Sequence, residues 1–262
     1  QTYGGDLSST RYSALDQVNA SNFNKLEVAF RFKTDKLTDI SYAATFFVIV
    51  LYGVLTNAMS DYNLALFGMI TLWSFRLGGF LLMRIWKMGR DKRFDGMRDN
   101  FLAFGRFWLL QAITVWIVLI PSSFAFASNR PFVSDLSLLG IVIFITGLMI
   151  EANADLQKYR FSRNPKNKDK WIDEGIWHYS RHPNYFGEML VWAGVYIYVF
   201  PGLVGFQPLI GVISPLFITT MLLFVSGVPI LEKSADKKWG KQAAYQEYKR
   251  TTHLIIPLPR FK

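Results

Sequence analysis

The sequence contains no cysteine. Disulfides, thiolate nucleophiles and cysteine-based zinc or iron–sulfur sites are therefore excluded, and cysteine usage says nothing about the compartment. Histidine is also scarce, because the 262 residues include only His178, His182 and His253. A histidine-rich metal centre is not expected, and we predict no metal site. Acidic residues number 19 against 29 basic ones, which gives a formal net charge of +10.

Apolar residues are abundant: 51% of the chain is hydrophobic, 16% is aromatic, and the mean hydropathy is +0.20. This composition is too apolar for an ordinary soluble domain. A bilayer core about 30 Å thick needs roughly 20 helical residues. Apolar runs of about that length lie near residues 40–57, 64–86, 107–127, 135–155, 185–204 and 209–231. The sequence therefore predicts an all-α, polytopic bundle of about six transmembrane helices.

Lysine and arginine are distributed unevenly between the connections. The two long connections and the tail carry many of them, whereas the short links at 58–63, 128–134 and 205–208 contain only Arg130. Counting positive charges by side places both termini and both long loops in the cytoplasm. The positive net charge then reflects topology and contact with membrane lipid rather than nucleic-acid binding. We predict an integral protein, in a bacterial inner membrane, with its active-site mouth on the cytoplasmic side.

The first 33 residues are polar and carry no secretory apolar region. Their YGGD, TRYS, LDQ-x-N and AF-x-F pieces resemble the opening of quinoprotein dehydrogenases, whose β-propellers bind pyrroloquinoline quinone. A propeller needs several blades, so a fragment of this size cannot form a quinone site. We interpret residues 1–35 as an appended segment and residues 36–262 as the transmembrane domain.

The segment GIWHYSRHPNYFGE at 175–188 places a polar cluster directly before an apolar run. Pro183 suits the first turn of a helix, so the fifth helix is expected to begin at His182 or Pro183. Free amides and the positive end of the helix dipole would then face the cytoplasmic layer, where Ser180, Arg181 and His182 add donors for a phosphate or carboxylate. The alternative is that Arg181 and His182 only anchor the helix among the lipid headgroups.

Helical spacing places Arg181, Tyr185, Glu188 and Trp192 on one face. A carboxylate one turn inside the apolar layer costs about 2.5 kcal/mol or more unless it is paired or faces water, so Glu188 is expected to point into the bundle. Its alternative role is an interhelical ion pair with Arg76, which lies midway along the second apolar run. Arg76 itself is either part of the site or a structural lock, with Glu151 or Glu188 as its partner.

Helix four is expected to end with a second polar set at the same level, in which Glu151, Asp155 and Lys158 follow one another at helical spacing. Charge at a helix end is often only a snorkelling interface. The tail carries Lys237, Lys238 and Lys241, which an amphipathic helix on the bilayer would turn toward lipid phosphates.

From about residue 36 the chain resembles bacterial membrane proteins of the steroid 5-alpha-reductase C-terminal class, the domain of unknown function 1295 type. The resemblance lies in the stretch DLQKYRFSRNPKNKDKWIDEGIWHYSRHPNYFGEMLVWAG, in SGVPILEK and in AYQEYKRTTHLIIPLP. It implies a helical membrane reductase of lipid metabolism that uses NADPH, with the ribose and adenine end near Asn153 and Asp155. Arg160 or Arg163 would bind the 2′-phosphate, and Glu188 would lie near the nicotinamide. The segment with Tyr248 and Arg250 would form a lid.

The mechanism expected from this resemblance is hydride transfer from NADPH to a carbon–carbon double bond of an apolar, lipid-like or steroid-like small molecule. Glu188 and Tyr185 are the predicted catalytic residues. The predicted cofactor-binding residues are Asn153, Asp155, Arg160, Arg163, Tyr179, Ser180, Arg181, His182, Asn184, Tyr248 and Arg250. A steroid is in doubt, because no acidic residue occurs in the first three apolar runs and Trp73 replaces the tyrosine expected before Arg76.

Two other functions stay open. Isoprenylcysteine carboxyl methyltransferases share the RHP-x-Y-x-G element and a similar bundle, so an S-adenosylmethionine-dependent methyltransferase is the alternative enzyme. A membrane scaffold or transporter could use Arg76, but it would not need Asp155, Asn184 and Glu188 at one depth. The substrate and the oligomeric state do not follow from the sequence.

Overall fold

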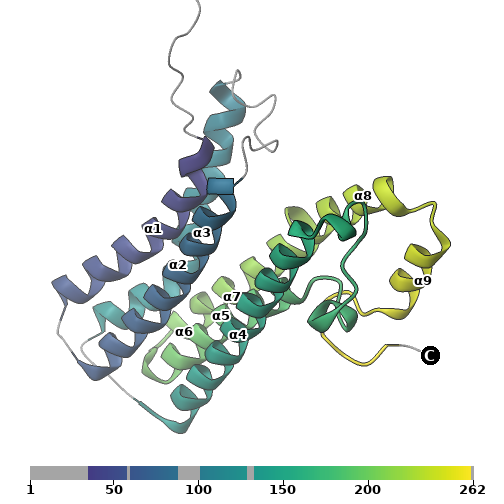
Figure 1. Cartoon of the computed structure of the whole chain (residues 1–262). Coiled ribbons are helices and arrows are strands. Elements are labelled where there is room, and N and C mark those ends of the chain that lie inside the picture. Colours follow the sequence, from purple (N-terminus) through teal and green to yellow (C-terminus); the bar gives the residue numbers. More distant parts are fainter. Residues whose placement is uncertain (1–34, 58–59, 88–100, 129–132, 261–262) are drawn as a thin grey trace, which may run out of the picture. The chain divides into compact units, whose positions relative to one another are not determined.

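The computed structural model describes residues 35–57, 60–87, 101–128 and 133–260, all within the unit Asp35–Lys262. Every regular element in these ranges is helical (Figure 1). The α-helices are α1 (Asp35–Thr56), α2 (Asp61–Lys87), α3 (Phe101–Ala127), α4 (Asp135–Arg163), α5 (Pro183–Val199), α6 (Gln207–Gly211), α7 (Ile213–Thr220), α8 (Val228–Trp239) and α9 (Ala243–Thr251). The predicted appended segment 1–35 lies almost wholly outside the described residues.

Among the residues that the structure describes, four helical stretches are long and apolar enough to cross a membrane: Asp61–Arg84, Gly105–Ala127, Asp135–Arg163 and Gln207–Trp239. The apolar part of α1, Ile40–Thr56, is shorter, and α5 has only 17 residues. The chain is therefore an all-helical, membrane-spanning protein. The count of six spans and the cytoplasmic placement of both termini stay predictions.

The C-terminal ends of α4 and α5 differ from the predicted runs, and proline accounts for the end of α5. Helix α5 starts at Pro183, as predicted, and ends at Val199, five residues before the predicted end at 204, where a 3₁₀ turn with Pro201 follows. Proline cannot donate the amide that would continue the helix. Helix α4 instead continues eight residues beyond the predicted end at 155, to Arg163, and is followed by Pro165.

The last predicted run, 209–231, is not one regular helix. It is divided into α6, α7, a π-helical turn at Met221–Val225 and α8. Pro229 occupies the first turn of α8. Proline and π-turns are two established causes of helix breaks and kinks. Helix α8 thereby begins a new segment whose polar face reaches the start of α5, as described below.

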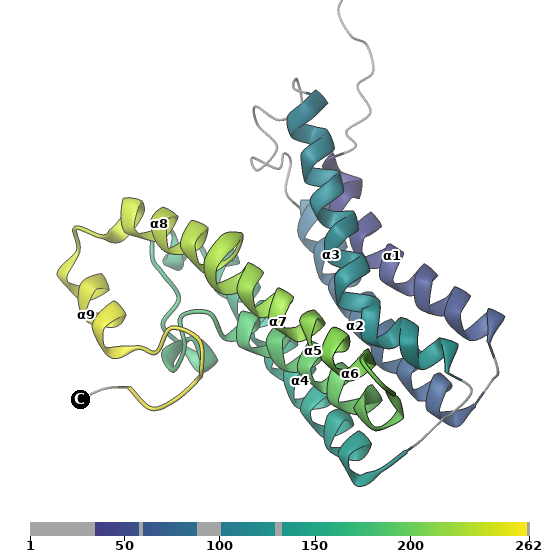
Figure 2. The ribbon, with the colours of Figure 1, turned by 180° about the vertical axis from the view of Figure 1, so that it is seen from behind.

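Helices α4 and α5 pack backbone to backbone along a series of glycines. Gly140 and Gly147 on α4 face Gly194 and Gly187 on α5, each pair spaced by seven residues, or about two helical turns. A Cβ atom added to Gly187 would lie 2.6 Å from the Gly147 carbonyl oxygen and 2.6 Å from the Glu151 amide nitrogen. Small residues permit this close approach between helices in a membrane. The polar ends of α4 and α5 are thereby held side by side (Figure 2).

An aromatic core joins α5 to the first two helices. The rings of Phe46 on α1, Trp73 on α2 and Trp192 on α5 lie 4.8–5.3 Å apart by centroid, and all three side chains are fully buried. Trp73 is the residue that precedes Arg76 by one turn. The core therefore fixes the depth at which α2 presents Arg76 to α4 and α5.

Candidate functional site

The connection that leads into α5 is fixed by buried hydrogen bonds. A 3₁₀ turn at Gly175–His178 begins with Gly175 at φ +60°, a backbone conformation that glycine adopts without steric cost. The indole of Trp177 donates to the Ala154 carbonyl at 2.9 Å, which ties this turn to α4. The buried Ser180 hydroxyl donates to the Ile255 carbonyl at 2.6 Å and accepts the His182 amide at 3.2 Å. Its role here is to hold the backbone.

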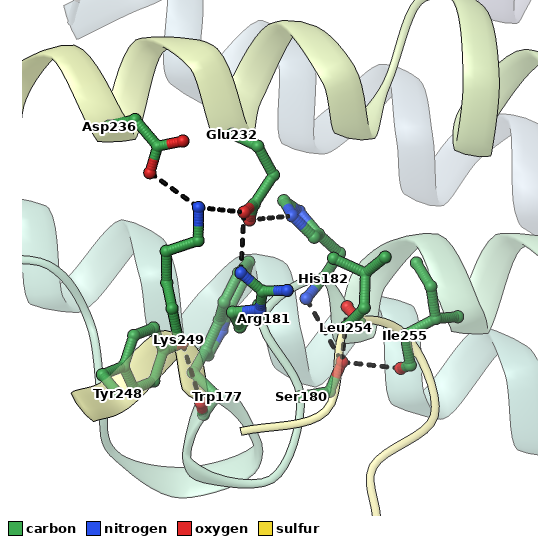
Figure 3. Close-up of polar contacts among 10 residues, drawn as sticks. All are labelled: Trp177, Ser180, Arg181, His182, Glu232, Asp236, Tyr248, Lys249, Leu254 and Ile255. Atoms are coloured by element: carbon green, nitrogen blue, oxygen red, sulfur yellow. Dashed lines mark hydrogen bonds and ion pairs between the residues drawn. The ribbon is translucent and has the colours of Figure 1, made fainter. Parts of the chain in front are cut away.

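Glu232 on α8 contacts three basic side chains, two at the start of α5 and one on α9 (Figure 3). Its carboxylate accepts from Arg181 Nη1 at 2.7 Å and from His182 Nε2 at 2.9 Å, and it contacts Lys249 Nζ at 3.1 Å. Lys249 Nζ also reaches Asp236 Oδ1 at 2.7 Å. The side chains of Glu232, Arg181 and His182 are 6–19% exposed. This ion cluster fastens α8 and α9 to the N-terminus of α5.

Burial is the main influence on the pKa of His182. Burial lowers its pKa below the usual value, against the opposing hydrogen bond and charge of Glu232. A carboxylate only accepts hydrogen bonds, so Nε2 carries the proton that faces Glu232 and Nδ1 holds a free lone pair. The Nδ1 atom is buried and has no partner among the described residues. The ring of Tyr185 stacks on His182 with centroids 5.5 Å apart.

A cavity of about 520 Å³ opens beside this cluster. Its walls come from the end of α4, the connection 167–182, α8 and α9. Aromatic side chains form much of the lining: Phe161, Trp171, Trp177, Trp239, Tyr245 and Tyr248. Trp171 lies edge-on to Tyr245 at 5.3 Å between ring centroids. The cavity therefore offers flat aromatic surfaces to a ligand.

The charged side chains of the cavity are mainly cationic. Five cations and two carboxylates line it: Lys158, Lys168, Lys170, Arg181, Lys238, Asp169 and Glu232. Arg181 is paired with Glu232, and Lys238 is paired with Asp169 at 3.0 Å. Within the described part of the chain, the other three lysines form no ion pair. Asp169 adopts φ 64°, rare for a residue with a side chain, between two of these lysines. The cavity is thus suited to a ligand that carries negative charge.

A second polar cluster lies deeper, where α2 meets α4 and α5. Arg76 forms ion pairs with Glu151 and with Asp155, the latter at 2.7 Å from Nη1 to Oδ2. The Asn184 amide donates to Asp155 Oδ1 at 3.4 Å. Glu188 lies one turn further along α5, close enough to Arg76 and Asp155 for their charges to interact. The predicted partnership of Arg76 with Glu151 is confirmed, and Asp155 is a second partner.

The cavity and this inner cluster adjoin each other along two helices. On α4, Lys158 lines the cavity one turn beyond Asp155, and its Nζ lies 4.5 Å from the centre of the Trp177 ring. On α5, His182 lines the cavity two residues before Asn184. The Asn184 Oδ1 and Glu151 Oε2 atoms are buried and lack donors among the described residues. An elongated ligand could therefore extend from the cavity toward these acceptors.

The predicted site residues are distributed over three places. Arg181, His182 and Tyr248 line the cavity, and Asp155, Asn184 and Glu188 belong to the inner cluster. Five predicted residues are exposed and do not line the cavity: Asn153, Arg160, Arg163, Tyr179 and Arg250. Three of the five make local contacts within their own helix: Asn153 donates to the Met149 carbonyl, Arg163 to the Tyr159 hydroxyl, and Arg250 to Glu247.

Several lining residues were not predicted. Trp171 and Glu232 both face the cavity, and Tyr245, from the predicted lid segment, also lines it. One signal was available for Glu232, because an acidic residue in SGVPILEK follows an apolar run in a strongly basic tail. Its three basic partners come from two other segments, the start of α5 and α9, so only the folded chain identifies it as the centre of a cluster.

The family comparison can be set against this geometry. A family model described as a protein of unknown function (DUF1295) matches residues 26–252. The chain belongs to the DUF1295 family. No curated protein and no solved structure matches it. The DUF1295 match includes all the residues of both polar clusters and the whole cavity lining, and it confirms the family predicted from the motifs. The likeness to steroid 5-alpha-reductases and to quinoprotein dehydrogenases stays a prediction.

Proposed function

We propose that this DUF1295 protein is a membrane-embedded reductase that binds NADPH and reduces a carbon–carbon double bond of an apolar small molecule. The observation that carries the proposal is the cavity at the polar ends of α4 and α5, with its aromatic walls and three lysines without ion pairs. Phosphates need cationic donors, and an adenine ring needs a flat apolar surface. The lysine and arginine count along the chain places this mouth on the cytoplasmic side in the proposal.

The residues present fit such a cofactor. Lys158, Lys168 and Lys170 would bind its phosphates, and Trp171 and Tyr245 would pack against the adenine. Three buried polar atoms here have no hydrogen-bond partner among the described residues: His182 Nδ1, Arg181 Nε and Trp171 Nε1. A buried polar group without a partner costs about 1–3 kcal/mol, so a ligand that satisfies these atoms gains affinity. Bound NADPH supplies the hydride.

The inner cluster would serve the reacting end. Arg76, Asp155 and Asn184 hold one another in place, which leaves Glu188 and Tyr185 as the side chains proposed to act near the reacting atoms. The aromatic core beside them excludes water, and apolar substrates reach it from the lipid. A positioned carboxyl or phenol can move a proton to the carbon next to the reduced one. The variants Glu188→Gln and Tyr185→Phe distinguish the two residues.

The charge of the cavity separates this proposal from methyl transfer. S-adenosylmethionine has no phosphate and a net positive charge, from its sulfonium and ammonium groups against one carboxylate, so three lysines that form no ion pair among the described residues suit it less than they suit NADPH. Its adenine could use the same aromatic walls. Direct titration of both molecules therefore distinguishes the two enzymes.

The test is isothermal calorimetry of the whole purified chain in lipid nanodiscs with NADPH, NADH and S-adenosylmethionine. Saturable NADPH binding is expected, and the double variant Lys168→Gln/Lys170→Gln should weaken it by about 1.5–3 kcal/mol, the range for a hydrogen bond to a charged group. Arg163→Gln is the matched control, because Arg163 is cationic and exposed but lies outside the lining. Saturable S-adenosylmethionine binding without NADPH binding would replace the reductase by the methyltransferase.

The rate of NADPH oxidation is the second measurement that tests the proposal. Glu188→Gln keeps the side-chain shape and should spare NADPH affinity while lowering the rate of NADPH oxidation with an accepted substrate. Tyr185→Phe is the parallel variant, because it removes only the phenolic hydroxyl. If both variants turn over at the parent rate, the inner cluster has no catalytic part.

A further inference from the structure

The segment that follows α9, residues 252–260, is fixed to the start of α5. The Arg181 amide donates to the His253 carbonyl at 2.9 Å, and the Ser180 hydroxyl donates to the Ile255 carbonyl. These two attachment points lie two and three residues before Pro183, where α5 begins. Consecutive residues span at most about 3.6 Å each, so the attachments lie within roughly 11 Å of the helix start.

That distance determines the depth of the segment. The polar layer on each side of a bilayer occupies the difference between a core of about 30 Å and a total thickness of about 40–45 Å. Helix α5 is apolar from Met189 onward, so the apolar layer begins within about two turns of its start. This attachment brings residues 252–260 within reach of the lipid headgroups.

The side chains of the segment alternate in exposure. Leu254, Ile256 and Leu258 are 38%, 50% and 46% exposed, whereas Ile255 and Pro257 between them are half-buried. Three exposed apolar side chains within five residues are unfavourable in water at about 25 cal/mol for each Å² of apolar surface. In a membrane interface the same side chains are favourable.

Exposed cations occur on the two helices that precede this apolar edge. Helices α8 and α9, which lie at the same end of the structure, carry exposed Lys233, Lys237, Lys241 and Arg250 (Figure 1). Lysine and arginine near a membrane are attracted to anionic headgroups by about 1 kcal/mol each. Exposed apolar side chains together with exposed lysine and arginine are typical of an interfacial anchor.

We propose that residues 252–260 form a lipid anchor, in which Leu254, Ile256 and Leu258 insert into the headgroup and acyl boundary of an anionic bilayer. The anchor continues directly from α9, which contributes Tyr245 and Tyr248 to the cavity and Lys249 to the Glu232 cluster. Contact with lipid therefore holds α9 in place over the cavity. The bilayer, and not a second protein, is the partner of this surface.

The absence of cysteine makes a direct test possible, because a single introduced thiol is the only one in the chain. Ile256→Cys carries a nitroxide label in the full chain, reconstituted into nanodiscs of phosphatidylcholine and phosphatidylglycerol. Electron paramagnetic resonance then measures the collision of the label with oxygen, which concentrates in lipid, and with a water-soluble nickel chelate. Val142→Cys on α4, 59% exposed within a spanning helix, is the lipid reference. Lys166→Cys in the exposed connection after α4 is the aqueous reference.

We expect the ratio of oxygen to nickel collision at 256 to exceed that at 166 several-fold and to approach that at 142. A ratio equal to that at 166 would show that the segment faces water, and low collision with both reagents would show that protein covers it. Either result overturns the anchor. Leu258→Cys repeats the measurement, so one poorly folded variant does not decide the outcome. The readout needs no cofactor and is independent of the proposed reductase.

Discussion

Glu232 offers the sharpest test of how the cavity is held together. One carboxylate serves Arg181, His182 and Lys249, and all of these contacts are 2.7–3.1 Å long. The variant Glu232→Gln keeps the size of the side chain and removes its charge. Arg181 and Lys249 then lose the charge that compensates them at a site where the Arg181 side chain is only 14% exposed.

The expected free-energy cost of Glu232→Gln depends on how deeply the cluster is buried. Breaking a fully buried pair costs about 3–5 kcal/mol, whereas a surface pair contributes about 0–1 kcal/mol. Lys249 retains Asp236 as a second partner, and the cluster is partly exposed, so we expect about 2–3 kcal/mol. This cost falls on the local opening of α9 from α5, because α9 is held there through Lys249. At about 1.4 kcal/mol for each tenfold change, the opening should become roughly 30- to 150-fold more frequent.

Hydrogen exchange measured by mass spectrometry in nanodiscs reports this opening directly. Peptides covering Ala243–Thr251 should exchange faster in Glu232→Gln, while peptides of α3 should not change. The control is Glu247→Gln on α9. The pair of Glu247 with Arg250 is exposed and should contribute little to stability. Equal exchange of α9 in the two variants would refute the idea that the Glu232 cluster fastens this helix.

Two further predictions concern the helix pair and the histidine. Gly187→Ala should lower the thermal stability of the detergent-solubilised protein, because the new methyl group would meet backbone atoms of α4; Gly79→Ala, with nothing within 4 Å, should not, and equal melting temperatures would contradict the close packing. Because burial lowers the pKa of His182, the folded chain binds fewer protons here than the unfolded chain, so stability should fall as the pH drops below about 6.5. His182→Gln should reduce that fall in a pH series of melting temperatures, and an unchanged slope would show that His182 is not responsible.

The sequence was sufficient to predict the helical class and the polar pairing inside the membrane. Hydrophobic runs identify membrane helices because a single apolar segment in lipid must satisfy its own backbone hydrogen bonds, which a helix does. Arg76 is costly in that environment, so a carboxylate partner such as Glu151 could be expected. The start of α5 could be predicted from Pro183, because an amide in the first turn of a helix has no partner within the helix and proline therefore costs no hydrogen bond there.

The cavity could not be predicted in the same way. Its lining joins α4, the connection after it, α8 and α9, and nothing in the spacing of Trp171 or Tyr245 indicates that these rings will meet. Helix α4 continues past the apolar run 135–155 and past Lys158 in its expected polar end, and this extension places Phe161 in the lining beside Lys158. Arg160 and Arg163 lie on the same extension but are exposed outside the cavity, a difference of helical phase that a motif alone does not show.

The glycine series explains how two charged clusters can lie so close to the apolar layer. Ion pairs in a low dielectric gain energy only if their geometry is nearly fixed, because desolvation offsets a poorly aligned pair. Gly147 and Gly187 bring α4 and α5 into backbone contact one turn before Glu151 and directly before Glu188, so these two side chains have little freedom to move. The same rigid pair carries Lys158 and His182 outward to the cavity. A ligand bound in the cavity therefore meets donors and acceptors whose positions are set before it arrives, which lowers the entropic cost of binding.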